Sequence, residues 1–440
     1  MLFKEWIEQA SFQFADQPAI TWQNNRWNYQ QLYQQIESEA QRFNELGIAQ
    51  HQLVMVSATQ ENLLRFLALW FIDVALIPIN PKFTNDQIES LQAEQSVHWW
   101  VDGSGACHKN NIVKTDPLLT PLSLGIYTSG STGHPKLAMF NFDALLRSAE
   151  GANQLIPMAP GHLSVLSLPY FHVGGIGILL RAWHKGAQVL VSDEPLPNLL
   201  NRFPTISHLS LVATQLSRLL QDSMPMAPPY CLVGGGPVDT QLLAAATDKG
   251  FGVWFTYGLT EMGSQVVTHS PDGLAQVLPH RQLSISTSGE ILVKGEVLFA
   301  GYLKNGQLTL PVDEEGWFHT RDLGEFHQSQ FKVMGRLDNQ FISGGENIQP
   351  EWIEQQLVKT LDLEAVVVVP VPNEEWGQRP FAFLSPLPET PWPQIRQNLA
   401  AKMPSYLIPD QALPLPESTG LKISRQQLTK QARDFLQGVK

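Results

Sequence analysis

The chain has 440 residues, which corresponds to two to four domains at roughly 100 to 200 residues each. Its 29 lysines and arginines against 41 aspartates and glutamates give a formal net charge of −12. This balance excludes a general nucleic-acid-binding protein, because such proteins need broad positive potential. Hydrophobic residues make up 43% and charged residues 16% of the sequence, so we expect a globular chain and not a disordered one.

The chain has two cysteines, Cys107 and Cys231. Two are too few for a disulfide framework or a four-thiolate zinc site, which favours a reducing compartment. Residues 1–6 lack the features of a signal peptide, and the most apolar stretch, 63–79, is interrupted by charged residues. We therefore predict a cytoplasmic protein without membrane insertion.

Apolar strands alternate with helical segments over roughly the first 280 residues. The stretch 53–57 is typical of a buried strand, 62–73 of a helix, and 75–79 of a second strand, which together form a βαβ unit. The same rhythm recurs over 163–192 and 207–221. Such alternation predicts α/β layers with mainly parallel sheets.

After about residue 280 the pattern changes to short strands separated by turn signals. Segments 282–287 and 290–294 flank Ser288-Gly289, and Asn305-Gly306 follows. These signals predict antiparallel hairpins, arranged in a small β-barrel-like subdomain.

A third pattern begins near residue 338. We expect a helix at 351–360, a strand at 365–369, a helix at 394–401 and a final polar helix after Ser424. The prediction is an α/β fold in two domains: a large N-terminal domain, 1–337, of α/β layered subdomains plus the barrel-like one, and a smaller α+β C-terminal domain, 338–440.

A run rich in hydroxyl side chains and glycines, 127–136, ends in a lysine. Such a loop suits phosphate, because glycines let backbone N–H groups converge, hydroxyls add hydrogen bonds and the lysine supplies a point charge. It is not a Walker A loop, since the Gly-Lys-Ser/Thr ending is absent. An ordinary surface turn is the alternative. The candidate phosphate-binding residues are Thr128, Ser129, Gly130, Ser131, Thr132, Gly133 and Lys136.

This run resembles the signature loop of the adenylate-forming superfamily, which includes acyl-CoA synthetases, peptide-synthetase adenylation domains and luciferases. Further stretches resemble the superfamily's other motifs, in order, over almost the entire chain. The resemblance implies that the C-terminal domain is mobile. The further stretches are 233–238, 256–261, 317–322, 333–339 with 343–348, and 374–380 with 421–425.

The resemblance implies an ATP site on the N-terminal domain. Tyr257 would cover one adenine face, while Gly235 and Gly236 admit the ring edge. Thr260 would contact the α-phosphate, and Glu261 would hold Mg²⁺, a hard cation that prefers oxygen. Taken alone, the tyrosine is typical of a core and the Thr-Glu pair of a helix start. Gly258 completes this segment.

Further roles fall on the C-terminal part of the chain. Asp322 resembles the ribose-binding aspartate, and Arg336 would add a second nucleotide contact. Lys422 would be the catalytic lysine of the first half-reaction, because an ammonium stabilises the charge that builds at the α-phosphate. The alternative for Lys422 is a solvated lysine in a basic tail.

In the superfamily the small domain rotates between the two half-reactions. Asp338 matches the hinge position. Gly344 and Gly345 match a loop that approaches the pantetheine arm of coenzyme A, and small residues suit such close approach.

Several stretches further resemble a branch of the superfamily, the 2-succinylbenzoate-CoA ligases of menaquinone biosynthesis. Their substrate is an aromatic dicarboxylate, so one carboxylate is activated while Arg181, next to the apolar run Ile176–Leu180, would hold the other. His172 resembles an acyl-pocket position, and a structural histidine is the alternative. The stretches are 167–175 with 181–183, 212–216, 320–325 and 341–351.

The resemblance implies an AMP-forming acid-thiol ligase that uses ATP, Mg²⁺ and coenzyme A through an acyl-adenylate. Its partners would be these small molecules, with no nucleic acid and no membrane; a homo-oligomer stays open. A benzoate-type or short-chain acyl-CoA synthetase and a catalytically inactive nucleotide-binding sensor are the alternatives.

Overall fold

The structure, a computed structural model, describes most of the 440-residue chain. The described residues are 1–22, 25–110, 122–128, 135–222, 227–236, 238, 240–327, 329–416 and 424–438. They group into two compact units. One unit holds the described residues up to 283 together with 293–318, and the other holds 284–292 and those from 319 onward.

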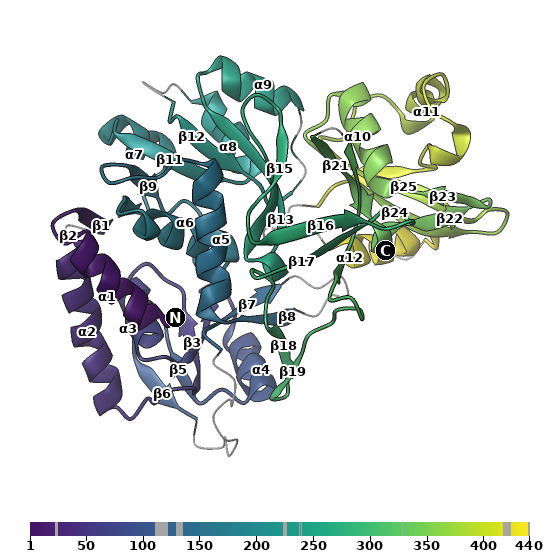
Figure 1. Ribbon diagram of the computed structural model, residues 1–440. Helices are drawn as coiled ribbons and strands as arrows, with labels where there is room; N and C mark the ends of the chain where they lie inside the picture. The colour runs from purple at the N-terminus through teal and green to yellow at the C-terminus, as the bar shows by residue number, and fades with distance from the viewer. Residues whose placement is uncertain are drawn as a thin grey trace. The chain divides into compact units, whose positions relative to one another are not determined.

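The first unit contains an eight-stranded sheet of order β19-β18-β8-β7-β4-β3-β5-β6 (Figure 1). The predicted βαβ unit is confirmed, since β3 and β4 are parallel and helix α3 joins them. Every residue of β3 and β4 is buried, as expected for parallel strands with both faces covered. The elements are β3 Leu53–Ser57, α3 Leu63–Phe71, β4 Ala75–Ile79, α4 Asn85–Gln95, β5 Trp99–Val101, β6 Cys107–Lys109, β7 Leu124–Thr128, β8 Lys136–Phe140, β18 Gly301–Lys304 and β19 Gln307–Thr309.

A nine-stranded sheet in the same unit has the order β15-β14-β13-β12-β11-β9-β10-β1-β2. Its central strands, from β13 to β1, are parallel, and its edge pairs are antiparallel. The strands are β1 Pro18–Trp22, β2 Asn25–Asn28, β9 Leu163–Val165, β10 Gln188–Val191, β11 Ile206–Leu211, β12 Tyr230–Val233, β13 Val253–Leu259, β14 Ser264–His269 and β15 Ala275–Val277.

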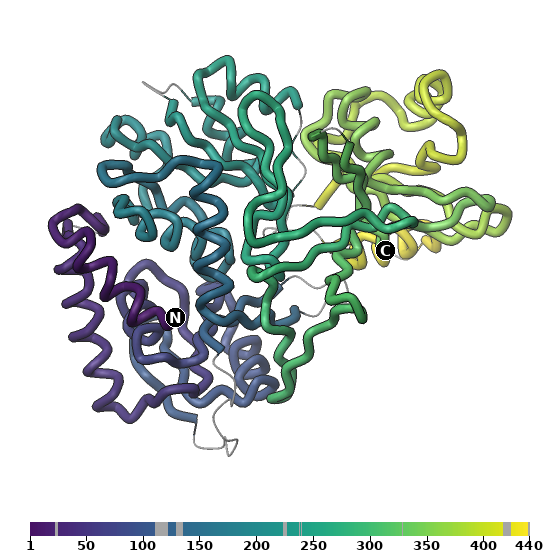
Figure 2. Tube along the Cα trace, in the orientation of Figure 1, coloured from purple at the N-terminus to yellow at the C-terminus, as the bar shows by residue number. Residues whose placement is uncertain are grey.

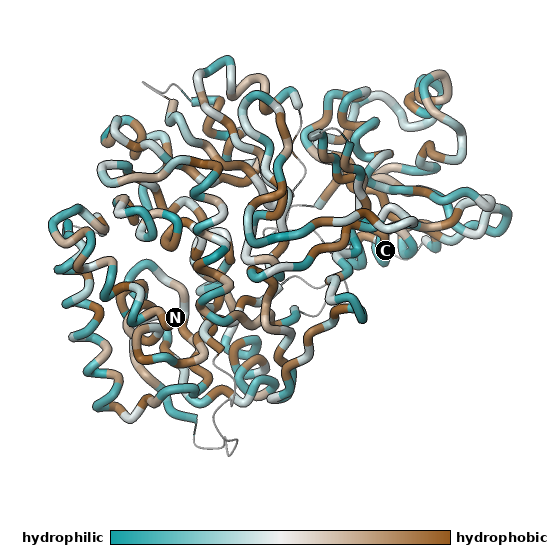
Figure 3. Tube along the Cα trace, viewed as in Figure 1, coloured by the Kyte–Doolittle hydropathy of each residue, from teal (hydrophilic) through white to brown (hydrophobic). Residues whose placement is uncertain are grey.

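Amphipathic helices cover these two sheets. Along α2 the buried residues Leu32, Ile36, Ala40 and Phe43 recur at helical spacing, and the same helix alternates between hydrophobic and hydrophilic segments in Figure 3. In Figure 2 the blue tube of α5 runs down the middle of the first unit. The helices are α1 Phe3–Gln13, α2 Tyr29–Glu45, α5 Phe142–Leu155, α6 Val173–His184, α7 Leu196–Arg202, α8 Ala213–Gln221 and α9 Thr240–Asp248.

The hairpins expected after residue 280 are present. A four-stranded sheet has the order β16-β17-β20-β21, and the turn between β16 and β17 contains Ser288-Gly289. The predicted turn at Asn305-Gly306 joins β18 to β19. The strands of the four-stranded sheet are β16 Arg281–Ile285, β17 Glu290–Gly295, β20 Phe318–His327 and β21 Gln330–Arg336.

The second unit is α+β, with its own apolar core between helices and a three-stranded sheet of order β24-β25-β26. Its final helix, α12, begins at the predicted place, because the Ser424 side chain accepts a hydrogen bond from the Gln427 N–H as an N-cap. The elements are β22 Phe341–Ser343, β23 Glu346–Ile348, α10 Pro350–Leu361, β24 Ala365–Asn373, β25 Gly377–Ser385, α11 Trp392–Ala400, β26 Ala412–Pro414 and α12 Arg425–Leu436.

Within the ranges given above, no helix is both long enough and apolar enough to cross a bilayer. The mixed α/β architecture agrees with the predicted fold class. The division at residue 337 stays a prediction.

Candidate active site

The end of β13 carries four of the predicted nucleotide-site residues. Tyr257 and Gly258 lie in the strand, and Thr260 and Glu261 lie in the 3-10 helix η1, Thr260–Met262, that follows it directly. A Cβ on Gly258 would stand 1.7 Å from the carbonyl oxygen of Ser264 in the neighbouring strand. Only glycine therefore allows β13 and β14 to approach so closely before the chain turns.

The predicted glycine loop follows the strand next to β13. Gly235 and Gly236 come just after β12, which is parallel to β13 in the register Val233 opposite Phe255. Gly235 has a φ of +83°, a conformation that favours glycine. Carboxyl ends of parallel strands meet at one edge of a sheet, so the glycine loop and the Tyr257 segment leave the same edge.

The predicted phosphate loop connects β7 and β8, which pair with Thr128 opposite Lys136. Its central residues, Ser129, Gly130, Ser131, Thr132 and Gly133, lie outside the described residues. The Lys136 ammonium lies 5.1 Å from the centroid of the Tyr302 ring.

Tyr302 also contacts Glu261. Its hydroxyl donates a 2.6 Å hydrogen bond to Glu261 Oε1. The candidate phosphate-binding lysine and the candidate metal-binding carboxylate therefore share one aromatic neighbour.

Glu261 fits a magnesium ion that arrives with a nucleotide. Within the ranges that the structure describes, no three His, Cys, Asp or Glu side chains gather as in a metal site. Magnesium is commonly bound by one or two carboxylates plus substrate phosphates and water, and does not need a cage made by the protein alone. The single carboxylate of Glu261, which shares the Tyr302 side chain with Lys136, agrees with that mode of binding.

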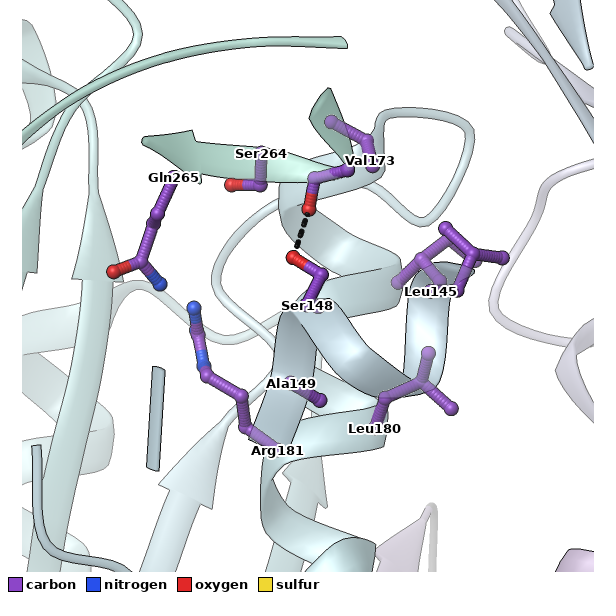
Figure 4. Close-up of a pocket in the computed structure, with 11 residues that line it drawn as sticks. Leu145, Ser148, Ala149, Val173, Leu180, Arg181, Ser264 and Gln265 are labelled. Carbon is purple, nitrogen blue, oxygen red and sulfur yellow. Dashed lines mark hydrogen bonds between the residues drawn. The ribbon is translucent and has the colours of Figure 1, made fainter. Parts of the chain in front are cut away.

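A pocket in the first unit lies between α5, α6 and the start of β14 (Figure 4). Its walls combine apolar side chains with the polar side chains of Ser148, Arg181, Ser264 and Gln265. The labelled lining residues are Leu145, Ser148, Ala149, Val173, Leu180, Arg181, Ser264 and Gln265.

Arg181 is the charged residue of this pocket. It is 7% exposed, and its Nη2 donates a 2.8 Å hydrogen bond to Ser210 Oγ. Burial lowers the pKa of Arg181 from 12.5 to about 10, so the guanidinium is still charged at neutral pH. Among the described residues no carboxylate lies within ion-pair distance of it.

A second buried arginine, Arg281, lies behind the pocket. It donates a 2.7 Å hydrogen bond to Ser148 Oγ, and Ser148 in turn donates to the Gly263 carbonyl at 2.6 Å. Burial lowers the pKa of Arg281 to about 9. The Ser148–Gly263 hydrogen bond thus ties the α5 wall of the pocket to the turn between β13 and β14, and the Arg281–Ser148 hydrogen bond ties that wall to β16.

His172 occupies the residue before α6, at its N-cap position. Its ring lies 4.5 Å from that of Phe171, and it is half-buried. It is not among the residues that line the pocket of Arg181.

In the second unit, Asp322 and Arg336 are brought together by strand pairing. They are opposite each other in the β20–β21 register, and Arg336 Nη1 donates to Asp322 Oδ1 at 2.8 Å. Arg336 also pairs with Asp338, which Arg321 contacts from the other side. Burial alone would raise the pKa of Asp338, but the hydrogen bonds from the two arginines lower it below its usual value.

Gly344 and Gly345 form the turn between β22 and β23, with φ values of +59° and +86°. A Cβ on Gly344 would stand 2.2 Å from the Trp376 ring, so a larger residue would displace this turn. Lys422 lies outside the described residues.

Sequence reasoning did not find Tyr302, Ser210, Ser148 or Arg281. Tyr302 contacts the predicted Glu261, and Ser210 contacts the predicted Arg181, whereas Ser148 and Arg281 contact each other; all three contacts join segments far apart in the chain. No local motif signals such contacts. The pairing of β18 with β8, which places Tyr302 near Lys136, is a non-local event of this kind.

The family model of AMP-binding enzymes matches residues 7–120 and 113–303. These ranges cover more than half of the chain and include the phosphate loop, the glycine loop and the Tyr257–Glu261 segment. The chain therefore belongs to the AMP-binding enzyme family, and the expected relation to adenylate-forming enzymes is confirmed.

Individual relatives are similar over nearly their whole length. The chain is 33% identical to the 2-succinylbenzoate–CoA ligase of Escherichia coli strain K12, covering 97% of this chain and 98% of that protein. It is 32% identical to the ligase of the same name from Haemophilus influenzae, covering 94% and 95%. Among solved structures, wild-type E. coli MenE with a bound phenylether-linked analogue of OSB-AMS is 30% identical and has a TM-score of 0.83. That similarity covers 98% of this chain and 99% of the solved one.

Proposed function

We propose that this chain is an ATP-dependent acid-thiol ligase of menaquinone biosynthesis. It converts 2-succinylbenzoate and coenzyme A to 2-succinylbenzoyl-CoA through an acyl-adenylate and releases AMP and pyrophosphate. The observation that carries this proposal is the similarity to 2-succinylbenzoate–CoA ligases over 97% of the chain at 33% identity.

Arg181 supports a dicarboxylate as the substrate. A buried guanidinium without a carboxylate partner among the described residues is costly to the protein, unless a bound anion compensates it. When the succinyl carboxylate of the substrate is at the nucleotide, the ring carboxylate remains to be bound. Arg181 binds that carboxylate.

ATP binds at the carboxyl edge of β12 and β13. Tyr257 covers the adenine, Gly235 and Gly236 leave room for the ring edge, and Thr260 contacts the α-phosphate. Lys136 and its loop bind the phosphates, and Asp322 and Arg336 contribute to binding of the ribose. Glu261 would hold Mg²⁺ together with the phosphates, and the ion would neutralise part of the triphosphate charge.

The first step joins the acid to AMP. An oxygen of the succinyl carboxylate attacks the α-phosphorus, and the bond from phosphorus to the pyrophosphate oxygen breaks. Lys422 stabilises the charge that develops at phosphorus, which makes its contribution larger in the transition state than in the ground state.

The second step transfers the acyl group to coenzyme A. The thiol sulfur attacks the acyl carbonyl carbon, the thiol proton is lost, and the bond from carbon to the AMP oxygen breaks. The mixed anhydride already carries the activation, so the protein supplies mainly orientation. Between the steps the C-terminal domain, 338–440, rotates about Asp338, and the Gly344–Gly345 turn then contacts the pantetheine arm.

The proposal also includes the compartment in which the enzyme works. The compartment is cytoplasmic, which is supported by the two cysteines of the chain, both free in the structure. The oligomeric state stays open.

The test is a pyrophosphate-release assay with the full chain. With ATP, Mg²⁺ and coenzyme A, 2-succinylbenzoate is expected to give 2-succinylbenzoyl-CoA and one pyrophosphate per product, whereas benzoate and butyrate give little. Preference for benzoate or butyrate would instead make the chain a benzoate-type or short-chain acyl-CoA synthetase. If the chain binds nucleotide but releases no pyrophosphate with any of the three acids, it is instead a catalytically inactive nucleotide-binding sensor.

A further inference from the structure

Tyr302 connects the two groups expected to handle the phosphates and their metal ion. Its hydroxyl donates a hydrogen bond of 2.6 Å to Glu261 Oε1. Its ring lies under the Lys136 ammonium, 5.1 Å from the centroid. Lys136 lies in β8 of the eight-stranded sheet, whereas Glu261 lies in η1 between two strands of the nine-stranded sheet, and Tyr302 contacts both residues.

The pairing of β18 with β8 places Tyr302 within reach of Lys136. β18 is antiparallel to β8, and Tyr302 is opposite Ala138. Lys136 is two residues from Ala138 and therefore on the same face of β8, where diagonal neighbours are within reach of long side chains.

The backbone of Glu261 is fixed by the residues just before β18. The Phe299 N–H donates a 2.8 Å hydrogen bond to the Glu261 carbonyl, and the Phe299 ring packs edge-on against the Tyr302 ring at 4.8 Å. One short segment, 299–302, thus holds both the backbone and the side chain of Glu261.

We propose that Tyr302 is a positioning residue for the metal–nucleotide complex, an inference that rests on the proposed function. Its hydroxyl fixes one oxygen of Glu261 and thereby orients the other oxygen toward the cation. Its ring face holds the Lys136 ammonium in place through a cation–π contact. The two tasks fall on different parts of one side chain, so different substitutions separate them.

Tyr302→Phe removes the hydroxyl and keeps the ring. Hydrogen bonds to charged groups are the stronger ones, so we expect metal binding with nucleotide present to weaken by about tenfold. Nucleotide binding without metal should stay near that of the unaltered chain, because the Lys136 contact is retained. Tyr302→Leu removes hydroxyl and ring, and should weaken both.

The measurement needs no turnover. Mn²⁺ replaces Mg²⁺, and its binding to the full chain is followed by electron paramagnetic resonance with the non-hydrolysable α,β-methylene analogue of ATP. Calorimetry with the analogue alone gives metal-free nucleotide binding. Tyr29→Phe is the matched control, because it also removes a buried tyrosine hydroxyl with one 2.6 Å hydrogen bond, to the Ala187 carbonyl.

Glu261→Gln completes a double-substitution cycle. If Tyr302 acts through Glu261, Tyr302→Phe should cause little further loss of Mn²⁺ affinity in the Glu261→Gln background. Circular dichroism and thermal unfolding show whether each variant is folded.

The proposal is overturned if folded Tyr302→Phe binds Mn²⁺ as the unaltered chain does, or if the two losses in the cycle simply add. It is also overturned if Tyr302→Phe weakens metal-free nucleotide binding as much as metal binding, which would indicate a general structural role. A chain that binds Mn²⁺ with the analogue as expected but does not ligate 2-succinylbenzoate would refute the proposed function and leave this inference intact.

Discussion

Replacement of Arg181 by methionine should weaken substrate binding without weakening the fold. Methionine has a similar length and is apolar, so it fills the space between α5 and α6 while removing the charge. The lost contact is a charge-assisted hydrogen bond to the ring carboxylate, worth about 1.5 to 3 kcal/mol. We expect the KM for 2-succinylbenzoate to rise by roughly ten- to a hundredfold, with the KM for ATP almost unchanged.

Without substrate, the free energy of unfolding of Arg181→Met should stay the same or rise. Burial lowers the pKa of Arg181 from 12.5 to about 10, which corresponds to a cost of about 3 kcal/mol for the charged form at neutral pH. Methionine removes this cost and also removes the hydrogen bond to Ser210, worth about 1 kcal/mol. Without substrate, Arg181→Met is therefore expected to unfold at the same temperature as the unaltered chain or above it.

The assay compares two acids. 3-Benzoylpropionate has the succinyl carboxylate of 2-succinylbenzoate but lacks the ring carboxylate, so it should not need Arg181. In pyrophosphate release, the preference for 2-succinylbenzoate over 3-benzoylpropionate should collapse in Arg181→Met. An equal rise in KM for both acids, or a marked fall in unfolding temperature, would refute the reasoning, because either would point to a structural role.

Three further expectations concern the half-reactions and the fold. Lys422→Ala should block adenylate formation but spare thioester formation from pre-made acyl-adenylate, as measured by rapid quench; equal loss of both steps would contradict this. Asp338→Pro should do the reverse, because it fixes the hinge, and retained thioester formation would count against the hinge. Burial lowers the pKa of His208 from 6.5 to about 4, so below pH 6.5 the unfolded chain binds a proton that the folded chain does not. The unfolding free energy, measured by denaturant titration, should therefore fall by about 2 kcal/mol by pH 5. If the unfolding free energy of His208→Phe depends on pH just as strongly, another group is responsible.

Local sequence signals predicted most elements well and misplaced some ends. The helix predicted at 351–360 is α10, Pro350–Leu361, whose first residue is a proline that suits the first helical turn. The strand predicted at 365–369 continues to Asn373 through two prolines, Pro370 and Pro372. β24 is an edge strand, where a residue without an N–H is tolerated, so proline is a poor stop signal there.

The candidate site was predicted only as separate motifs. The resemblance of these motifs to those of the superfamily assigned candidate ATP-site residues, because each motif is a local run of side chains with its own chemistry. The sequence did not reveal Tyr302 or Ser210, because their partners, Glu261 and Arg181, are distant in the chain. Such hydrogen bonds depend on how strands pair and helices pack, so a local sequence pattern does not predict them.

Arg336 differs from the two buried arginines, Arg181 and Arg281, in how its charge is compensated. Arg336 is partly exposed and is paired with Asp322 and Asp338. A nucleotide that contacted it would replace a carboxylate oxygen that already compensates the charge, at a site where solvent screens the interaction. Arg181 and Arg281 are buried, and the structure gives them only uncharged partners among the residues it describes. A chain of net charge −12 does not attract anions by its overall field. We therefore expect selection of the acid to depend on Arg181, which in our proposal binds a carboxylate in a weakly screened pocket and so distinguishes a diacid from a monoacid.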